Sequence, residues 1–238
     1  MSSKMTIKKI TLFILIILIP ISGIFALEIS SKEAEAFLNT GYNRSYGFFG
    51  GISAKGYLEL ENCVLFKAGI ALGSSEYKLD INTFLGANYY PFTGNKYLLP
   101  LNFSVSYIYN GLPEFKAHTH SILPVVSYST DRAGISIGSN FRFSSFFGEP
   151  AQFESIFSFF LFFNFINMDI FKAGISIGTF NDFEARNMGA YALGINTKIN
   201  INNNWSVLNE YEVLQSGGDG FSTTFYALSI RIGARYSW

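Results

Sequence analysis

Two histidines, His118 and His120, are the only ones in the chain, and they lie with Ser121 in the segment AHTHS. A hydrolase would need the serine hydroxyl within hydrogen-bond reach of an imidazole, and a third group that orients the ring. In a strand, however, Ser121 points away from both histidines, because an odd number of residues separates it from each. The two histidines share a face, as two metal ligands would, but the sequence identifies no third ligand. We therefore expect a surface or interfacial histidine pair, with no catalytic, metal or cofactor site.

Other reactive motifs are sparse. The single cysteine, Cys63, excludes an intrachain disulfide, and its position excludes lipid attachment to a new N-terminal cysteine. The sequence contains no CxxC pair and no nucleotide-binding loop, and the glycine pairs at 50–51 and 217–218 lie in or beside expected turns. These features favour a protein that is not an enzyme.

The composition departs from that of a soluble protein. Of 238 residues, 49% are hydrophobic and 18% aromatic, but only 14% are charged, whereas soluble domains have about 25% charged residues. The six prolines form no linker, so a single domain is expected. Lysine plus arginine and aspartate plus glutamate number 17 each, which gives no indication of a nucleic-acid partner.

The first 26 residues have the pattern of a secretory signal peptide. Three lysines precede an apolar stretch at residues 10–19, and a cleavage site follows Ala26. The apolar stretch is shorter than the roughly 20 residues of a membrane-spanning helix, although an uncleaved anchor helix is the alternative. Residues 27–238 are then the mature domain, which is mildly acidic because the signal removes lysines and no acidic residue.

One seven-residue pattern occurs three times. KAGISIG at residues 172–178 recurs as RAGISIG at 132–138 and as KAGIALG at 67–73. The unequal spacing argues against a solenoid or a propeller. Within each copy, apolar residues alternate with charged, small or polar ones, which is the period of a β-strand. We expect isoleucine to face lipid and glycine or serine to face a lumen, although hairpin duplication would also explain the copies.

Several alternating segments end in aromatic residues. In YLLPLNFSVSYIYN, residues 97–110, one face carries Leu, Phe and Val with Tyr at both ends, and the other carries Pro, Asn and Ser. An aliphatic band between aromatic girdles is typical of the lipid side of a transmembrane barrel strand. No window after Ala26 is long and apolar enough for a spanning helix, and an open sheet would leave backbone groups unpaired in lipid. A closed barrel is therefore expected.

The expected fold is an all-β, transmembrane antiparallel up-and-down β-barrel of about 12 strands, within a range of about 8 to 14. The expected strands span residues 34–43, 46–60, 63–73, 77–90, 97–109, 117–128, 133–146, 153–166, 170–179, 188–201, 205–214 and 222–238. Tight turns near 61–62, 131, 167–169 and 202–204 are expected at the periplasmic side, and connections at 73–76, 110–116, 148–152, 180–187 and 215–220 at the cell surface.

The chain ends in SIRIGARYSW, with apolar or aromatic residues at every second position back from Trp238. Together with the signal peptide and the girdled strands, this ending resembles that of bacterial outer-membrane β-barrel proteins, without indicating a specific family. The resemblance implies that Tyr236 and Trp238 belong to the signal read by the barrel-assembly machinery. It also implies outer-membrane lipid and periplasmic chaperones as partners, and a location in the outer membrane of a diderm bacterium. It does not indicate an oligomeric state.

Charged residues lie on the expected inner faces of the strands, where they are tolerated only if they contact water or one another. Lys67, Lys172, Lys198 and Arg235 are expected at the periplasmic mouth. The other expected inward charges are Lys55, Lys78, Arg142, Arg231, Glu59, Asp80, Glu154, Glu210 and Glu212. An excess of basic groups favours anions weakly, so we predict a narrow porin-like channel for small polar or anionic solutes.

Two other interpretations stay open. The inward charges could pair into a network that plugs the barrel, which would leave a structural or surface-exposed barrel. The apolar inner face of residues 153–166 could instead belong to a hydrophobic-ligand barrel, or pack against an N-terminal plug made from residues 27–40, such as Phe37 and Leu38. An outer-membrane hydrolase is disfavoured, because the His and Ser pattern of such enzymes is missing.

Overall fold

Twelve strands make up the fold in a computed structural model, which describes residues 29–45, 47–61, 63–75, 79–186, 190–216 and 224–238. They are β1 (Ile29–Asn43), β2 (Gly47–Leu60), β3 (Val64–Ser75), β4 (Leu79–Tyr89), β5 (Leu101–Leu112), β6 (Ala117–Ser129), β7 (Ala133–Ser145), β8 (Gln152–Asn167), β9 (Phe171–Gly178), β10 (Ala190–Asn200), β11 (Trp205–Ser216) and β12 (Thr224–Ser237). A short 3-10 helix, η1 (Pro113–Phe115), precedes β6. No helix among the described residues is long and apolar enough to span a membrane.

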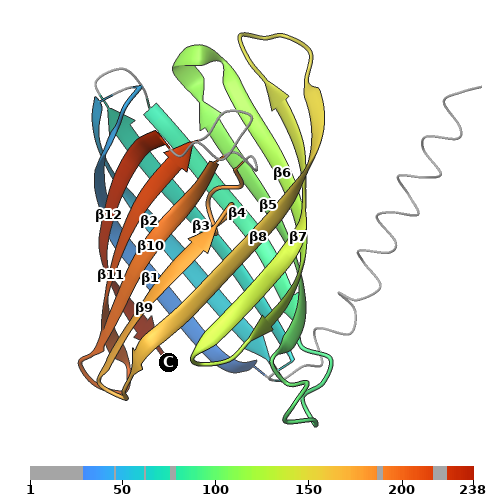
Figure 1. Cartoon of the computed structure of the whole chain (residues 1–238), viewed down its shortest axis with the longest axis vertical. Coiled ribbons are helices and arrows are strands. Elements are labelled where there is room, and N and C mark those ends of the chain that lie inside the picture. Colours follow the sequence, from blue (N-terminus) through green and yellow to red (C-terminus); the bar gives the residue numbers. More distant parts are fainter. Residues whose placement is uncertain (1–28, 46, 62, 76–78, 187–189, 217–223) are drawn as a thin grey trace, which may run out of the picture.

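The sheet is a closed antiparallel barrel. Each strand pairs with its neighbours in sequence, and β12 returns to pair with β1 (Figure 1). This confirms the predicted all-β up-and-down barrel and its strand number. The predicted signal peptide lies outside the described residues. The end of the barrel that carries Trp238, together with the turns after β2, β4, β6, β8 and β10, is called the C-terminal rim.

The predicted starts of two strands are wrong: β1 begins at Ile29 and not at residue 34, and β5 begins later than predicted. The alternating pattern suggested a strand from residue 97, but β5 begins at Leu101. Asn95 holds the preceding residues in a turn, because its side-chain oxygen accepts hydrogen bonds from the backbone N–H groups of Tyr97 (3.0 Å) and Leu98 (3.4 Å). A local side-chain cap of this kind competes with strand pairing, so Tyr97 lies in the turn and does not belong to a strand.

The outer face of the barrel exposes an apolar band. Leu85 on β4, Ile195 on β10 and Ile232 on β12 are 62%, 51% and 52% exposed, respectively. Aromatic residues such as Tyr89 and Trp205 are exposed at strand ends on the C-terminal rim. Soluble monomers rarely expose a continuous apolar surface above a few hundred Å², whereas a barrel in lipid requires one. The barrel is therefore built to span a membrane.

The three repeated segments lie in β3, β7 and β9, and each begins beside a turn at the C-terminal rim. Their isoleucines face outward as predicted; Ile175, for example, is 49% exposed. Their glycines face inward against side chains of the neighbouring strand. A Cβ atom at Gly69 would lie 2.5 Å from the ring of Phe84, and one at Gly174 would clash with the side chain of Asn164. The glycines of the repeat thus make room for larger lumen-facing residues beside them.

The last residue of the chain helps to close the barrel. The backbone N–H of Trp238 donates to the carbonyl oxygen of Lys32 (3.0 Å), and the N–H of Lys32 donates to the carbonyl oxygen of Trp238 (3.3 Å). The ring of Tyr236 lies between those of Trp205 and Trp238, with centroid distances of 4.8 and 5.4 Å. The chain terminus therefore continues the β1–β12 pairing and carries an aromatic cluster.

The two faces of β10 should respond differently to a charge. We expect Ile195→Arg to lower the free energy of unfolding by about 2–4 kcal/mol, as arginine on the lipid face at mid-membrane does. Asn196→Arg, one residue along, should cost much less, because Asn196 lies opposite Glu210 on the inner face. Equilibrium unfolding from lipid vesicles measures both variants. Equal losses would contradict the assignment of the two faces.

Candidate functional site

The connection from β9 to β10 folds into the lumen. β9 ends at Gly178, opposite Phe160 of β8, while β8 itself continues along the wall to Gln152. The chain then turns inward through residues 179–186, where Phe180 bridges to Ala185 (Figure 1). We call this segment the inward loop. Its expected position at the cell surface, as part of residues 180–187, is wrong.

A compact turn shapes the inward loop. The side-chain oxygen of Asn181 accepts hydrogen bonds from the backbone N–H groups of Phe183 and Glu184, both at 2.9 Å. The backbone N–H of Asn181 in turn donates to the carbonyl oxygen of Glu184 at 2.8 Å. These bonds pair backbone groups of the turn with one another and with its own side chain. The wall supplies the other partners: the N–H of Thr179 donates to the carbonyl oxygen of Phe159 on β8 (2.9 Å), and the carbonyl oxygen of Phe183 accepts from the side-chain amide of Asn110 on β5 (2.7 Å).

One side of the inward loop is apolar. Phe183 and Ala185 are buried in a cluster with side chains from the inner face of β3 to β6, and the rings of Phe183 and Phe84 meet edge to face at 5.0 Å. Phe180 packs on Phe160 of β8, with ring centroids 5.9 Å apart. The cluster consists of Ala71, Phe84, Ile108, Leu123, Val125, Phe183 and Ala185. The inward loop thus packs on Phe160 of the apolar inner face noted in the sequence and on a second apolar surface from β3 to β6.

The alternative of an N-terminal plug made from residues 27–40 is wrong. Residues 29–43 form the wall strand β1. Phe37 is buried on its inner face and Leu38, 69% exposed, lies on its outer face. A strand that must close the sheet cannot also fill the lumen, and the inward loop fills it instead.

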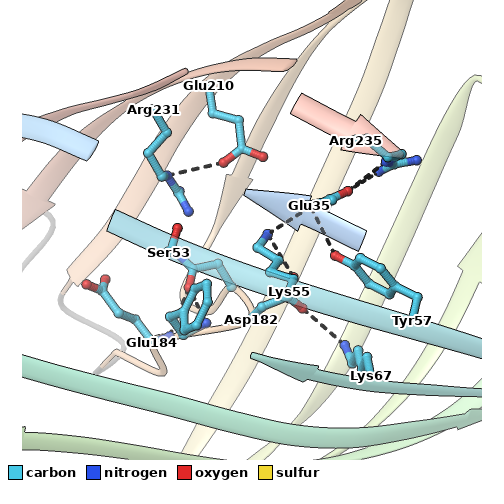
Figure 2. A network of polar contacts seen from close by, with 12 residues as sticks. Glu35, Ser53, Lys55, Tyr57, Lys67, Asp182, Glu184, Glu210, Arg231 and Arg235 are labelled. Atoms are coloured by element: carbon cyan, nitrogen blue, oxygen red, sulfur yellow. Dashed lines mark hydrogen bonds and ion pairs between the residues drawn. The ribbon is translucent and has the colours of Figure 1, made fainter. Parts of the chain in front are cut away.

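The other side of the inward loop is held by ion pairs. The Asp182 carboxylate lies 3.2 Å from the ammonium group of Lys55 and 3.2 Å from that of Lys67 (Figure 2). Lys55 also lies 3.7 Å from Glu35, which in turn bonds to Arg235 at 2.5 Å. The Glu35 side chain is only 2% exposed, so its charge depends on these partners. Asp182 therefore links the loop to β2 and β3.

Further charges fix the end of the inward loop. Arg186 pairs with Glu184 and lies 3.7 Å from Glu212 on β11. Arg142 on β7 donates a hydrogen bond to the carbonyl oxygen of Ala185. The loop is thus anchored to β2, β3, β7 and β11, which lie on different sides of the barrel.

The predicted lumen residues share the interior but do not form one basic mouth. Lys67 and Arg235 are paired with acidic groups, as described above. Lys172 and Lys198 lie opposite each other in register and form no ion pair with any described residue. Arg231 pairs with Glu210 (3.2 Å) and Glu212 (2.9 Å), and Arg142 pairs with Glu154 (3.8 Å). Glu59 accepts a hydrogen bond from Ser31 (2.9 Å), Asp80 lies opposite Gly73 of β3, and Lys78 lies outside the described residues. Most of the predicted charges among the described residues are therefore paired, as in the alternative interpretation, and Lys172 and Lys198 are the predicted basic residues there that form no ion pair.

Glu35, Asp182 and Arg186 were not predicted from the sequence. Glu35 could have been found, because it lies within the expected first strand, residues 34–43, on the same face as Phe37 and Asn39. No local signal marks Asp182 or Arg186, since nothing in a polar connection shows that it folds inward.

Three cavities follow one another past the charged side of the inward loop. A cavity of about 320 Å³ on the C-terminal side contains Lys67, Ser104 and Asn196 in its lining. A cavity of about 490 Å³ on the opposite side is lined by residues that include Asn110 and Thr119. A cavity of about 150 Å³ lies between them. It shares Asn181, Glu212 and Arg231 with the first, and Asp80, Asn82, Glu184, Arg186 and Leu214 with the second.

The histidine pair lies on the outer face of β6, as expected for an interfacial pair. The hydroxyl of Tyr107 and Nδ1 of His120 are 2.6 Å apart, and the rings of His118 and His120 are 5.4 Å apart. Ser121 is buried on the inner face, so the hydroxyl and the imidazoles lie on opposite sides of the wall. No group of three or more potential metal ligands occurs within the described part of the chain.

Comparison with known proteins gives matches at the level of structure. No family model matches the chain, and no curated protein matches it. A solved outer membrane channel from Pseudomonas putida F1 aligns with a TM-score of 0.55 and 6% identity, over 89% of this chain and 97% of that one. The KdgM porin in complex with disordered oligogalacturonate aligns with a TM-score of 0.54 and 9% identity, over 87% and 99%. The chain has the fold of bacterial outer-membrane β-barrels.

The same fold serves more than one task. The translocator domain of the autotransporter NalP from Neisseria meningitidis aligns with a TM-score of 0.51 and 12% identity, over 87% of both chains. Because a channel, a porin and a translocator domain share this architecture, the function of the present barrel has to be argued from its lumen.

Neutralising Asp182 should loosen the inward loop. Asp182→Asn leaves Lys55 with one partner and Lys67 with none among the described residues. Because the Asp182 side chain is 24% exposed, we expect a loss below the roughly 3–5 kcal/mol of a fully buried ion pair. We expect a larger and noisier single-channel conductance in a planar bilayer. Glu184→Gln is the matched control, because Glu184 pairs within the loop and leaves the attachment to β2 and β3 intact. Equal currents from Asp182→Asn and wild type would refute the anchoring role.

Proposed function

We propose that the protein is a narrow outer-membrane channel for small polar or anionic solutes, without catalytic chemistry or a cofactor. The three cavities that share lining residues past the inward loop are the observation that carries this proposal. The smallest of them, of about 150 Å³, has room for several water molecules, since one water molecule needs about 10–15 Å³. We expect only small polar solutes to pass this cavity while the loop stays in place.

The sequence pattern and the fold support a location and an orientation. The signal-peptide pattern of residues 1–26 and the barrel fold support export to the outer membrane, with cleavage near Ala26. The short turns after β6, β8 and β10 and the last strand support a periplasmic C-terminal rim. The 490 Å³ cavity then opens toward the cell surface, and the 320 Å³ cavity toward the periplasm.

The ionic selectivity of the channel should be weak. Most charged side chains in the lumen are paired with opposite charges. The electric field that a passing ion meets is therefore small except close to each pair. Lys172 and Lys198 are the exception among the described residues, and both lie near the periplasmic rim in β9 and β10. They support a mild preference for anions.

A closed structural barrel is the second candidate. The anchoring of the inward loop to several strands favours it, since a loop held on several sides obstructs most of the lumen. A hydrophobic-ligand barrel has less support, because Phe160 on the apolar inner face of β8 already packs against Phe180 of the loop.

Conductance and reversal potential distinguish these candidates. The refolded wild-type barrel should show small, steady single-channel currents with a slight preference for chloride over potassium. The double variant Lys172→Gln with Lys198→Gln should move the permeability ratio toward one without closing the channel. Lys96→Gln, in the turn between β4 and β5 outside the lumen, is the control and should leave the ratio unchanged. Silence from a correctly folded barrel would favour the closed structural barrel.

We also propose that Tyr236 and Trp238 act in assembly, through the barrel-assembly machinery and periplasmic chaperones. The aromatic cluster at Trp238 supports this role. Trp238→Ala keeps the backbone bonds to Lys32 but removes the ring, so we expect less folded barrel in the outer membrane, measured by heat-modifiable mobility in gels. Trp238→Phe should restore most of it. Normal amounts of the alanine variant would contradict the proposal.

A further inference from the structure

Three polar side chains are fully buried on the inner face of β6, β7 and β8. Ser121 on β6, Asn140 on β7 and Ser158 on β8 are each 0% exposed. The side-chain oxygen and nitrogen of Asn140 and the hydroxyls of Ser121 and Ser158 lack a hydrogen-bond partner among the described residues. These three residues, which we call the buried strip, are uncharged and can both donate and accept hydrogen bonds.

The wall residues around the buried strip place it beneath the inward loop. Arg142, which bonds to the loop, lies opposite Ser121 and two positions from Asn140. Phe160, two positions from Ser158 on the same inner face, packs on Phe180 of the loop. Leu123 and Val125, on the same face of β6 as Ser121, belong to the cluster around Phe183 and Ala185. The loop therefore covers the buried strip from the lumen side.

The buried strip is unfavourable if the loop never moves. A polar group taken out of water without a partner destabilises the state that buries it. Alanine, valine or leucine at the three positions would pack against Phe180, Phe183 and Ala185 without that cost, as Leu123 and Val125 already do. The strip suits a state in which the same wall faces water.

We propose that the buried strip is a solute-contact surface of the open channel, exposed when the inward loop leaves the wall, and that it fits neutral solutes that carry hydroxyl groups. This inference rests on the proposed channel function. Serine hydroxyls and an asparagine amide can pair with hydroxyls in either direction and bring no net charge, while the ring of Phe160 offers an apolar face beside them. The ion pairs of Asp182 hold the loop shut, and water can replace each of their partners when the loop leaves.

Cysteine accessibility tests whether the buried strip opens. In a Cys63→Ser background, Ser158→Cys and Ser121→Cys are treated with a small, water-soluble methanethiosulfonate reagent, and the modified fraction is followed by mass spectrometry. We expect slow modification with Asp182 present. Asp182→Asn should raise the rate about tenfold or more, because the loss of one ion-pair partner removes more free energy than a factor of ten requires.

The control for access is Ser104→Cys, which lines the 320 Å³ cavity on the open side of the loop. It should react readily, and at nearly the same rate with and without Asp182. If both strip cysteines stay unreactive in both backgrounds while the Ser104 variant reacts, the strip is permanently sealed and the proposal is overturned. Two positions are used so that a folding defect at one does not decide the result.

Solute passage tests the proposed ligand class. With the loop released by Asp182→Asn, we expect Asn140→Leu to slow the entry of arabinose into liposomes several-fold while chloride conductance is retained. Unchanged arabinose entry, or an equal loss of both, would overturn the strip as a contact surface for neutral solutes.

The accessibility result does not depend on current, so the two proposals can fail separately. Conductance without labelling of the buried strip would support the channel function and contradict the strip as a contact surface. Labelling of the buried strip in a barrel that never conducts would support the movement of the loop and contradict the channel function.

Discussion

The closure of the sheet between β1 and β12 is the constraint on which the rest of the structure depends. A strand edge in lipid cannot bond to water, so the two edges must pair with each other. The register of this pair places Glu35 beside Arg235 and Ala36 beside Ala234. One strand pair thus satisfies the backbone, presents small apolar side chains to lipid and turns opposite charges inward. Once the barrel is closed, the charged side chains of its strands have only the lumen to occupy.

The lumen charges are balanced mainly by register. Glu35 lies opposite Lys55 on one neighbouring strand and opposite Arg235 on the other, and opposite charges facing each other across strands are favourable. Lys67 differs, because the residues opposite it on β2 and β4 are a tyrosine and a glycine. Asp182 supplies the acidic partner that the wall does not. The inward loop therefore completes the charge balance of the barrel as well as narrowing it.

The strands and their faces could be predicted because their signal is local. Period-two alternation placed Arg231 and Glu210 on the inner face and gave the strand number. Which charges pair could not be predicted in the same way, because pairing depends on register between distant segments; Glu35 and Arg235 are 200 residues apart. The position of the inward loop was missed for a related reason. Its polar residues fit a surface connection, and the early departure of the chain from the wall, after the 8 residues of β9 beside the 16 of β8, is evident only in the structure.

Contacts between apolar side chains stabilise the barrel to different extents on the lipid side and on the lumen side of the wall. In lipid, an apolar side chain gains little from meeting another, because the acyl chains are equally apolar. In a lumen that holds water, burying Phe183 against Phe84 is favourable by the ordinary hydrophobic effect. The cluster around Phe183 is therefore a core of the kind found in soluble proteins, built inside the barrel from one connection and the inner wall.

The forces that hold the inward loop depend on salt in opposite ways. Excluded salts such as sulfate strengthen apolar contacts, whereas screening weakens ion pairs that water can reach, such as those of Asp182. The barrel wall depends on neither, since backbone hydrogen bonds in lipid hold it together. The width of the lumen is therefore set by a balance within the loop, while the shape of the barrel around it stays fixed.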